Sequence, residues 1–333
     1  MANRFLNLLE RAKQSNSPIL VDGAMGTQLM AAGLLFGDPP ELWNVLADRQ
    51  DKVRGVYRGY LEAGSDIILT NTFGGSPFRL KMHHLQDRTF ELNQAGAALA
   101  RAEAGERVVA GDIGPSGEIF VPMGALTYEA AVDGFARQAE GLLAGGADCF
   151  WIETMSDLQE VRAAVEGARK VDGSMPIVAT MTFDTRGFTM MGVSPADAMI
   201  ELSKLDLAAI GGNCGNGPDE LEAVIYAMSM VRQDIPLVGK SNAGMPVFVD
   251  GKTSYLASPE AMAEAGRRIR AFGATIIGGC CGSTPAHISA MKAALLTQPA
   301  LDPTTLSLTV PLAKRQEASG ERRERRARRV QEV

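Results

Sequence analysis

The sequence predicts a single (β/α)8 TIM barrel, an α/β fold in which eight parallel strands form a closed ring inside a layer of helices. Short apolar runs rich in β-branched residues recur eight times, and each is followed by small or polar residues and then by a segment of helical periodicity. These runs are continuously apolar rather than alternating, which is typical of parallel strands buried on both faces. A doubly wound sheet is the alternative, but it rarely needs eight such regular units.

The expected elements can be placed along the chain. The strands are expected, in order, at 19–21, 66–70, 108–110, 149–152, 177–180, 208–210, 237–239 and 274–277. Three helices have a clear start, because an N-cap residue precedes Pro at the first helical position in Ser194-Pro195, Ser258-Pro259 and Thr284-Pro285. Gly145-Gly146 marks a helix end before the fourth strand. We expect the barrel to occupy residues 1–300, and an Arg- and Glu-rich extension, flexible or helical, to occupy 301–333.

The composition is that of an ordinary globular protein. The chain has 333 residues, of which 46% are hydrophobic and 22% charged. At about 150 residues per domain this length suggests two domains, but an α/β barrel reaches ~250 residues as one. No apolar run reaches the ~18 residues of a membrane span, and the first residues lack the apolar segment of a secretory signal. We therefore expect a cytoplasmic protein that has no membrane partner.

The net charge of −6 is unevenly distributed. From Lys314 to the end, eight basic residues stand against four Glu, so this tail carries +4 and the remainder −10. An acidic body argues against nucleic acid as the main partner. The tail could be a docking or RNA-binding arm, although a solvated helical extension with alternating Glu and Arg is favoured. The oligomeric state stays open, a homo-oligomer included.

Polar and sulfur-containing side chains follow the expected strands. The active site of such a barrel lies at the carboxyl ends of its strands, so these residues should share one rim. In chain order they are Asp22-Gly23, Asn71-Thr72-Phe73-Gly74, Gly111-Asp112, Glu153-Thr154, Thr182-Phe183, Asn213-Cys214, Ser241-Asn242 and Cys280-Cys281-Gly282.

Three of the four cysteines belong to this rim. Cys280 and Cys281 are adjacent, which is a poor geometry for an ordinary disulfide, and Cys214 follows a strand two places away in the ring. Three converging thiolates could hold one soft metal ion, with zinc favoured and a fourth coordination position left open. The alternative is that they are small buried hydrophobic residues, and this is the interpretation we favour for Cys149, inside the fourth strand.

An open zinc site with three thiolates favours thiol alkylation. Such a site would bind a substrate thiol, of free pKa about 8.5, as the thiolate at neutral pH. Attack by that thiolate needs no general base. The three histidines agree with this chemistry, because His83, His84 and His287 lie in helical stretches and are expected to be ordinary surface or packing residues.

Five motifs give the sequence a resemblance to the homocysteine S-methyltransferase family over about residues 18–295. They are Val21-Asp22-Gly23-Ala24-Met25-Gly26-Thr27, Thr70-Asn71-Thr72-Phe73, Trp151-Ile152-Glu153-Thr154, Gly212-Asn213-Cys214 and Gly278-Gly279-Cys280-Cys281-Gly282. The resemblance implies a zinc ion bound by Cys214, Cys280 and Cys281, with the sulfur of homocysteine as the fourth ligand.

The same resemblance implies contacts to the rest of homocysteine. Asp22 and Glu153 would hold its amino group, and Gly23 would lie near its carboxylate, which a glycine amide can approach closely. Asn71 and Asn213, in the same motifs, are further candidate substrate contacts.

The methyl donor is suggested by a resemblance to bacterial betaine–homocysteine methyltransferases. It includes Pro40-Glu41-Leu42-Trp43-Asn44 and Gly124-Ala125-Leu126-Thr127-Tyr128. A quaternary ammonium donor is typically bound by an aromatic cage. Trp43, Phe73 and Tyr128 could contribute to such a cage. The alternative role of these three residues is packing. Gly74 is a departure, because animal betaine enzymes carry a tyrosine there.

The leading hypothesis is a zinc enzyme that uses betaine or another small onium donor, and two alternative functions remain. The homocysteine module of cobalamin-dependent methionine synthase shares Asn71-Thr72-Phe73 and Glu153-Thr154. The chain has no room for folate and cobalamin domains, so it would then be one subunit of a split enzyme that accepts methyl from a corrinoid protein. The more distant alternative is a non-catalytic binding module that docks through its basic tail.

Overall fold

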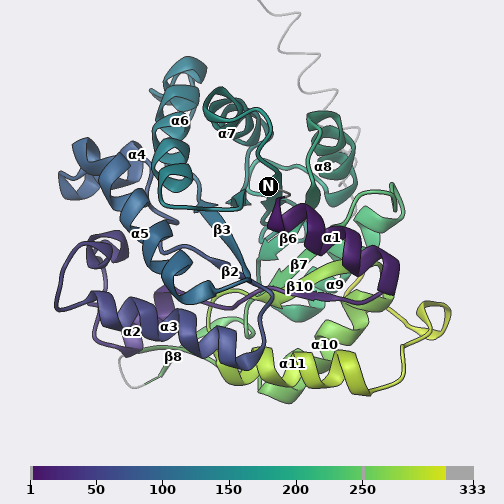
Figure 1. Cartoon of the computed structure of the whole chain (residues 1–333). Coiled ribbons are helices and arrows are strands. Elements are labelled where there is room, and N and C mark those ends of the chain that lie inside the picture. The colour runs from purple at the N-terminus through teal and green to yellow at the C-terminus, as the bar shows by residue number, and fades with distance from the viewer. Residues whose placement is uncertain (1–2, 250–251, 313–333) are drawn as a thin grey trace, which may run out of the picture.

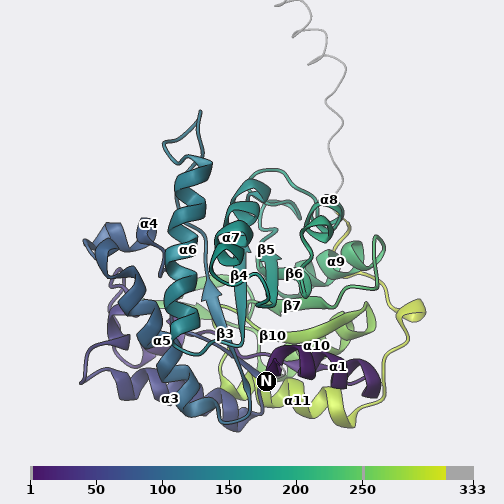
Figure 2. The ribbon, with the colours of Figure 1, turned by 45° about the horizontal axis from the view of Figure 1, so that its top comes forward.

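A ring of eight parallel strands forms the centre of the molecule (Figures 1 and 2). The structure is a computed structural model that describes residues 3–249 and 252–312. The strands are β1 (Ile19–Leu20), β2 (Ile67–Leu69), β3 (Val108–Ile113), β4 (Cys149–Met155), β5 (Ile177–Met181), β6 (Ala209–Cys214), β7 (Leu237–Ser241) and β10 (Ala274–Gly279). Every expected strand is therefore present, although several extend further than the apolar run that predicted them.

The strand order closes the sheet into a barrel. Hydrogen-bonded neighbours follow the order β1-β10-β7-β6-β5-β4-β3-β2. A parallel bridge between Val21 and Ile67 joins the two ends, where the Asp66 N–H donates to the Leu20 carbonyl at 2.7 Å. The (β/α)8 prediction is confirmed, since an open doubly wound sheet would leave two unpaired edges.

Helices surround the ring, and the predicted helix starts are confirmed. The helices are α1 (Arg4–Ser15), α2 (Gly26–Ala31), α3 (Gln50–Ala63), α4 (Pro77–Leu80), α5 (Thr89–Ala104), α6 (Tyr128–Ala144), α7 (Leu158–Val171), α8 (Pro195–Leu202), α9 (Pro218–Ser229), α10 (Pro259–Ala271) and α11 (Pro285–Thr297). The Ser194 and Ser258 side chains cap α8 and α10. Thr284 forms a capping box with His287, so that histidine has a structural role. In the described residues no helix is long and apolar enough to cross a membrane.

The interior of the barrel is apolar at its amino-terminal end. Alternate strand residues point inward and form one cluster, which includes Leu69, Ala110, Trp151 and Val238. Cys149 belongs to this cluster and has no exposed surface, as predicted. Helix α1 packs against the cluster through Phe5, which is fully buried. This end of the barrel is therefore closed, and polar chemistry is confined to the other end.

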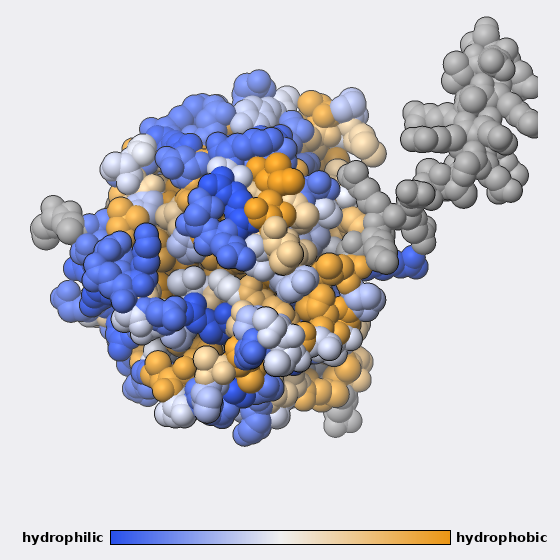
Figure 3. Space-filling view, turned by 90° about the vertical axis from the view of Figure 1, so that its right-hand side faces the viewer, coloured by the Kyte–Doolittle hydropathy of each residue, from blue (hydrophilic) through white to orange (hydrophobic). Residues whose placement is uncertain are grey.

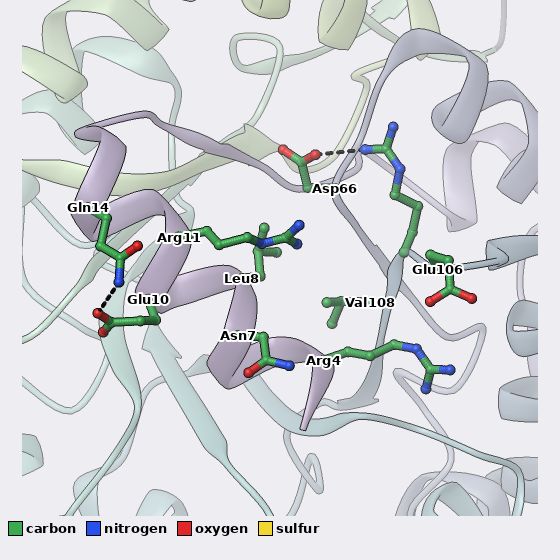
Figure 4. Close-up of a pocket in the computed structure, with 10 residues that line it drawn as sticks. Arg4, Asn7, Leu8, Glu10, Arg11, Gln14, Asp66, Glu106 and Val108 are labelled. Carbon is green, nitrogen blue, oxygen red and sulfur yellow. Dashed lines mark hydrogen bonds and ion pairs between the residues drawn. The ribbon is translucent and has the colours of Figure 1, made fainter. Parts of the chain in front are cut away.

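A pocket lies beside α1, near the beginnings of β2 and β3 (Figure 4). It has a volume of about 790 Å³ and is lined by side chains of both charges. Arg107 and Asp66 neutralise one another there across 2.7 Å, and Gln14 donates to Glu10. Paired charges leave little net potential for a ligand, so we assign this pocket no function.

Two segments lie outside the regular βα pattern. An antiparallel hairpin, β8 (Pro246–Val249) and β9 (Lys252–Tyr255), is inserted between β7 and α10 and was not predicted. After α11 the chain returns over α10, where Arg268 donates to the Ser307 carbonyl. Val310, Pro311 and Leu312 then line a groove beside α8 and α9. Figure 3 shows this side of the molecule, with hydrophobic residues in several groups among hydrophilic ones. The Arg-rich tail from residue 313 onward lies outside the described residues.

Candidate metal and substrate site

The three rim cysteines come together at the carboxyl end of the barrel. The Cys214 sulfur lies 3.4 Å from that of Cys280 and 3.8 Å from that of Cys281, and all three lie within 4.8 Å of one another. Tetrahedral zinc with Zn–S bonds of about 2.3 Å separates its sulfur ligands by roughly 3.8 Å. The spacing therefore fits three ligands of one tetrahedral metal ion.

Hydrogen bonds within the cysteine cluster favour a negatively charged sulfur, which a metal cation would bind. Hydrogen bonds from Cys214 and then Cys280 lower the pKa of Cys281 to about 3. The cluster therefore favours the thiolate form of Cys281, which the other two cysteines stabilise by hydrogen bonding. The Tyr255 phenol, from the β8–β9 hairpin, also forms a hydrogen bond with Cys281. Its ring lies against Gly282, where an added Cβ would come within 2.1 Å of it.

Two asparagines fix the backbone that carries the cysteines. Cys214 has a left-handed backbone with φ of 62°, which costs a non-glycine residue roughly 1–2 kcal/mol. The Asn213 side chain accepts from Thr154 N and Thr180 Oγ1 and donates to Thr154 Oγ1, which ties β6 to β4 and β5. Asn242 accepts from Cys281 N at 3.0 Å and donates to Gly215 O. Asn213 was expected as a substrate contact, but its side chain is used to hold the strand that carries Cys214. Asn242 does the same for the backbone of Cys281.

Asn71 also has its polar atoms engaged within the protein. Its side-chain amide donates to Pro40 O at 2.8 Å and to Asn44 Oδ1 at 2.9 Å. Its backbone N–H donates to the Tyr57 hydroxyl. These bonds join the end of β2 to the 3₁₀ helix Pro40–Asn44.

Buried acids and one lysine lie next to the thiols. Asp22 and Glu153 are 2% and 6% exposed. They are joined by Asp112, which was expected on the rim but was given no role, and by Lys240, which was not predicted to belong to the site. Lys240 Nζ pairs with Glu153 Oε2 at 2.8 Å and lies 5.6 Å from the centre of the Trp151 ring. Cys280 interacts electrostatically with all four charged groups.

The strand pleat explains why these groups share one layer. Glu153 lies two residues beyond the inward-facing Trp151 on β4, Asp112 two beyond Ala110 on β3, and Lys240 two beyond Val238 on β7. Sequence reasoning ended the third and fourth strands before Asp112 and Glu153, and this is corrected, because β3 runs to Ile113 and β4 to Met155. The polar residues therefore lie within strands, directly above the apolar interior.

Burial dominates the acid–base properties of this layer. It raises the pKa of Asp22 to about 7, against the attraction of Lys240. Burial likewise raises the pKa of Asp112 and of Glu153. Burial alone would lower the pKa of Lys240, but Glu153 and Asp22 outweigh it and raise that pKa. Lys240 is therefore a permanent cation in a layer that holds three acids.

Gly23 lies in a place that admits no side chain. A Cβ there would come within 2.5 Å of Ser283 Oγ and 2.8 Å of the Tyr60 hydroxyl. Both groups are held in place, since Ser283 Oγ accepts from Ala24 N and Tyr60 donates to a backbone carbonyl. No side chain therefore covers the backbone at Gly23, which directly follows the buried acid Asp22.

The aromatic residues expected around a donor are engaged in separate places. Trp43 is 6% exposed, and the Arg49 and Lys52 cations each lie 5.3 Å from its ring centre. Tyr128 forms a hydrogen bond with Glu166 at 3.0 Å. Phe73 packs against Gly114 at the end of β2. Among the contacts of the described residues, none joins these three rings to one another, whereas Tyr255 does reach a cysteine.

Comparison with known proteins gives a consistent set of relatives. A family model described as homocysteine S-methyltransferase matches residues 19–295. Methionine synthase of Mycobacterium tuberculosis is 36% identical over 320 residues, which cover 90% of this chain and 27% of that protein. Methionine synthase of Mycobacterium leprae is 35% identical over 290 residues, covering 82% and 24%. The chain thus spans about a quarter of the length of these relatives.

Solved structures agree with the fold. The homocysteine methyltransferase MmuM from Escherichia coli, in its oxidised form, superposes with a TM-score of 0.72 at 25% identity, covering 88% of this chain and 99% of that one. Its metallated form gives the same TM-score and identity and covers 87% and 99%.

Proposed function

Because the chain belongs to the homocysteine S-methyltransferase family, we propose that it forms methionine by methylating homocysteine at a zinc ion held by Cys214, Cys280 and Cys281. The observation that carries this proposal is the group of three sulfur atoms within 4.8 Å, at the end of the barrel where such folds place their chemistry. A tetrahedral set of sulfur ligands favours zinc. The E. coli homocysteine methyltransferase has a metallated form, which supports the binding of a metal ion by this chain as well.

The bound metal would supply one thing, a lowered pKa for the substrate thiol. The protein's own residues do the rest. Asn213 and Asn242 hold the cysteines in position through the hydrogen bonds described above. We propose that the substrate's amino group binds among the buried acids that include Asp22 and Glu153, and its carboxylate against the bare backbone at Gly23.

The methyl transfer itself is a displacement at carbon. The substrate thiol first loses its proton to solvent. Its sulfur then forms a bond to the donor's methyl carbon as the bond from that carbon to the donor breaks, and the donor atom keeps the electron pair. With betaine, the products are methionine and dimethylglycine. No side-chain base is required, and His287, in the helix that follows β10, is engaged in a helix cap.

A second donor class is favoured by the loops around this end of the barrel. Large apolar side chains stand exposed on the segments between β1 and α3, β3 and α6, β5 and α8, and β7 and α10. Phe36 is 93% exposed, Met123 85%, Met190 72% and Phe248, in β8, 78%. A small donor needs no such surface, whereas a protein that carries the methyl group would cover it. The second candidate is therefore the homocysteine-activating subunit of a split methionine synthase, fed by a corrinoid protein.

A donor screen on the zinc-loaded protein tests the proposal. With homocysteine and betaine we expect methionine and dimethylglycine in equal amounts, and none from Cys281→Ala, whose fold is checked by circular dichroism. Turnover with a methylated corrinoid protein but with no small onium compound would transfer the proposal to the second candidate. Methionine formation by Cys281→Ala at the wild-type rate would contradict the metal-centred mechanism, and absence of methionine with every donor would contradict homocysteine methylation.

A further inference from the structure

Two of the three candidate metal ligands can be reached from outside the protein. Cys280 is buried, whereas Cys214 and Cys281 are partly exposed. The thiolate is both the metal-binding and the nucleophilic form of a cysteine. A donor that methylates the substrate's thiolate therefore meets other reactive sulfur atoms at the same end of the barrel, and the methyl group has to be directed away from them.

Methylation of Cys281 would end the function of the site. Its sulfur would form a bond to the methyl carbon while the donor kept the electron pair, and the product would be a neutral thioether. Zinc sites in proteins are built from thiolates, imidazoles and carboxylates, so the loss of this charge would release the metal. The reaction thus needs a ligand that is a poorer nucleophile than the substrate.

Cys281 has a hydroxyl donor from outside the cysteine cluster. The Tyr255 phenol donates a hydrogen bond to its sulfur. In the described part of the chain, the hydrogen-bonding contacts of the Cys214 sulfur are to the other two cysteines. A hydrogen bond to an ionised group is roughly twice as strong as a neutral one, and it withdraws negative charge from the acceptor. Tyr255 therefore makes the Cys281 sulfur a weaker nucleophile.

Backbone hydrogen bonds at the base of the β8–β9 hairpin hold Tyr255 in this position. The Ala243 N–H donates to the Cys281 carbonyl at 2.9 Å, and the Ala257 N–H donates to the Ala243 carbonyl at 3.0 Å. The Ala257 carbonyl lies 3.0 Å from His287 Nε2, which joins the base of the hairpin to α11. The hairpin is thus tied through its backbone to the same residue that its tyrosine contacts.

The residue after Cys281 allows this close contact. Gly282 has φ of 79°, and a Cβ there would come within 2.1 Å of the Tyr255 ring. A side chain at this position would push the ring away from the sulfur. Within the described residues the Tyr255 hydroxyl makes no hydrogen bond other than the one to Cys281. The polar end of this side chain therefore acts on the cysteine alone.

We propose that Tyr255 directs the methyl group to the substrate by suppressing the nucleophilicity of Cys281. This inference rests on the proposed function and deepens it. The hydrogen bond weakens as the sulfur loses its charge, so it raises the barrier to methylation of this ligand. Tyr255 acts through Cys281 and is a positioning residue that decides which sulfur accepts the methyl group.

The test measures methylation of the zinc-loaded protein by methyl iodide, with peptide mass spectrometry to quantify the methyl groups on Cys281 and on Cys214. Tyr255→Phe removes the hydroxyl and keeps the ring against Gly282. We expect it to raise the rate of methylation of Cys281 about 10-fold, the low end of the effect of one charge-assisted hydrogen bond. The rate for Cys214 and the zinc content before reaction should stay at their wild-type values.

Two controls separate the effect of the hydrogen bond from other causes. Tyr226→Phe removes the same group from α9, where the ring packs against Phe272 with 5.2 Å between the ring centres. In this variant both cysteines should react as in the wild type. Iodoacetamide is a larger reagent, and Tyr255→Phe should raise its reaction with Cys281 by the same factor as that of methyl iodide, because the change lies in the sulfur and not in the access to it.

The outcomes that overturn the proposal are distinct. If Cys281 reacts equally fast in Tyr255→Phe and the wild type, the hydrogen bond does not control this sulfur. If only iodoacetamide reacts faster, the hydroxyl merely blocks access. If Cys214 reacts faster as well, or zinc is lost before the reagent is added, Tyr255 supports the site as a whole. The measurement uses no homocysteine, so a wild-type protein that forms no methionine would contradict the proposed function and leave this result standing.

Discussion

Cys214→Ser is expected to lose most of its zinc and, with it, methionine formation. The serine hydroxyl stays protonated near neutral pH, so the site keeps two thiolate ligands where tetrahedral binding needs three and the substrate. Changes in residues that merely support metal ligands already cost 10- to 100-fold in affinity, so loss of a ligand should cost on the order of 100-fold or more. Zinc per chain after dialysis against a weak chelator measures the effect.

Cys149→Ser is the matched control for this change. It makes the same atomic substitution in a fully buried cysteine of β4 that lies in the apolar interior. It should keep about one zinc per chain, although burying a hydroxyl there lowers stability by roughly 1–3 kcal/mol. A Cys214→Ser protein that retains a full equivalent of zinc, or a Cys149→Ser protein that loses it while folded, would show that the metal is not held at the rim.

Gly211→Ala is expected to destabilise the whole barrel. Gly211 lies in the middle of β6, where an added Cβ would come within 1.9 Å of the Val238 carbonyl oxygen and 2.7 Å of its carbonyl carbon. Both belong to the backbone of the neighbouring strand β7, which cannot move aside without breaking the pairing. We expect a loss of at least about 3 kcal/mol in the free energy of unfolding, measured by urea denaturation.

The control for this prediction is a glycine with free space around it. Gly55 is exposed in the middle of α3, and a Cβ there would meet no atom within 4 Å. Gly55→Ala should stabilise the protein by roughly 0.5–1 kcal/mol, because alanine costs less backbone entropy in a helix. Equal unfolding midpoints for Gly211→Ala and the wild type would contradict the close approach of β6 and β7.

The barrel and its cysteines were predictable because both follow from local patterns. Each apolar run marks a strand that pairs with a neighbour in the ring, and parallel strands bring their carboxyl ends to one rim. Cys214 and the Cys280-Cys281 pair could therefore be assigned to one site although they are far apart in sequence. The β8–β9 hairpin was missed because it lies outside this repeat, although Asp250-Gly251 directly after the apolar stretch Pro246–Val249 is a hairpin signal.

The layer formed by Asp22, Asp112, Glu153 and Lys240 was only partly predictable. Asp22 and Glu153 belong to recognisable motifs, but Lys240 follows an apolar run and has the position of an ordinary solvated strand end. Its role depends on acids from β1, β3 and β4, which only the closed ring brings near it. Side-chain direction was equally hidden, since the sequence gives Trp43 and Tyr128 as aromatic residues but not the neighbours that engage them.

The most direct test of a metal-centred homocysteine methyltransferase is X-ray absorption at the zinc edge, with and without homocysteine. We predict three sulfur ligands at about 2.3 Å in the free enzyme and four when homocysteine is bound. A sulfur count that stays at three under saturating homocysteine would contradict the account, because the substrate thiolate would then not bind the metal.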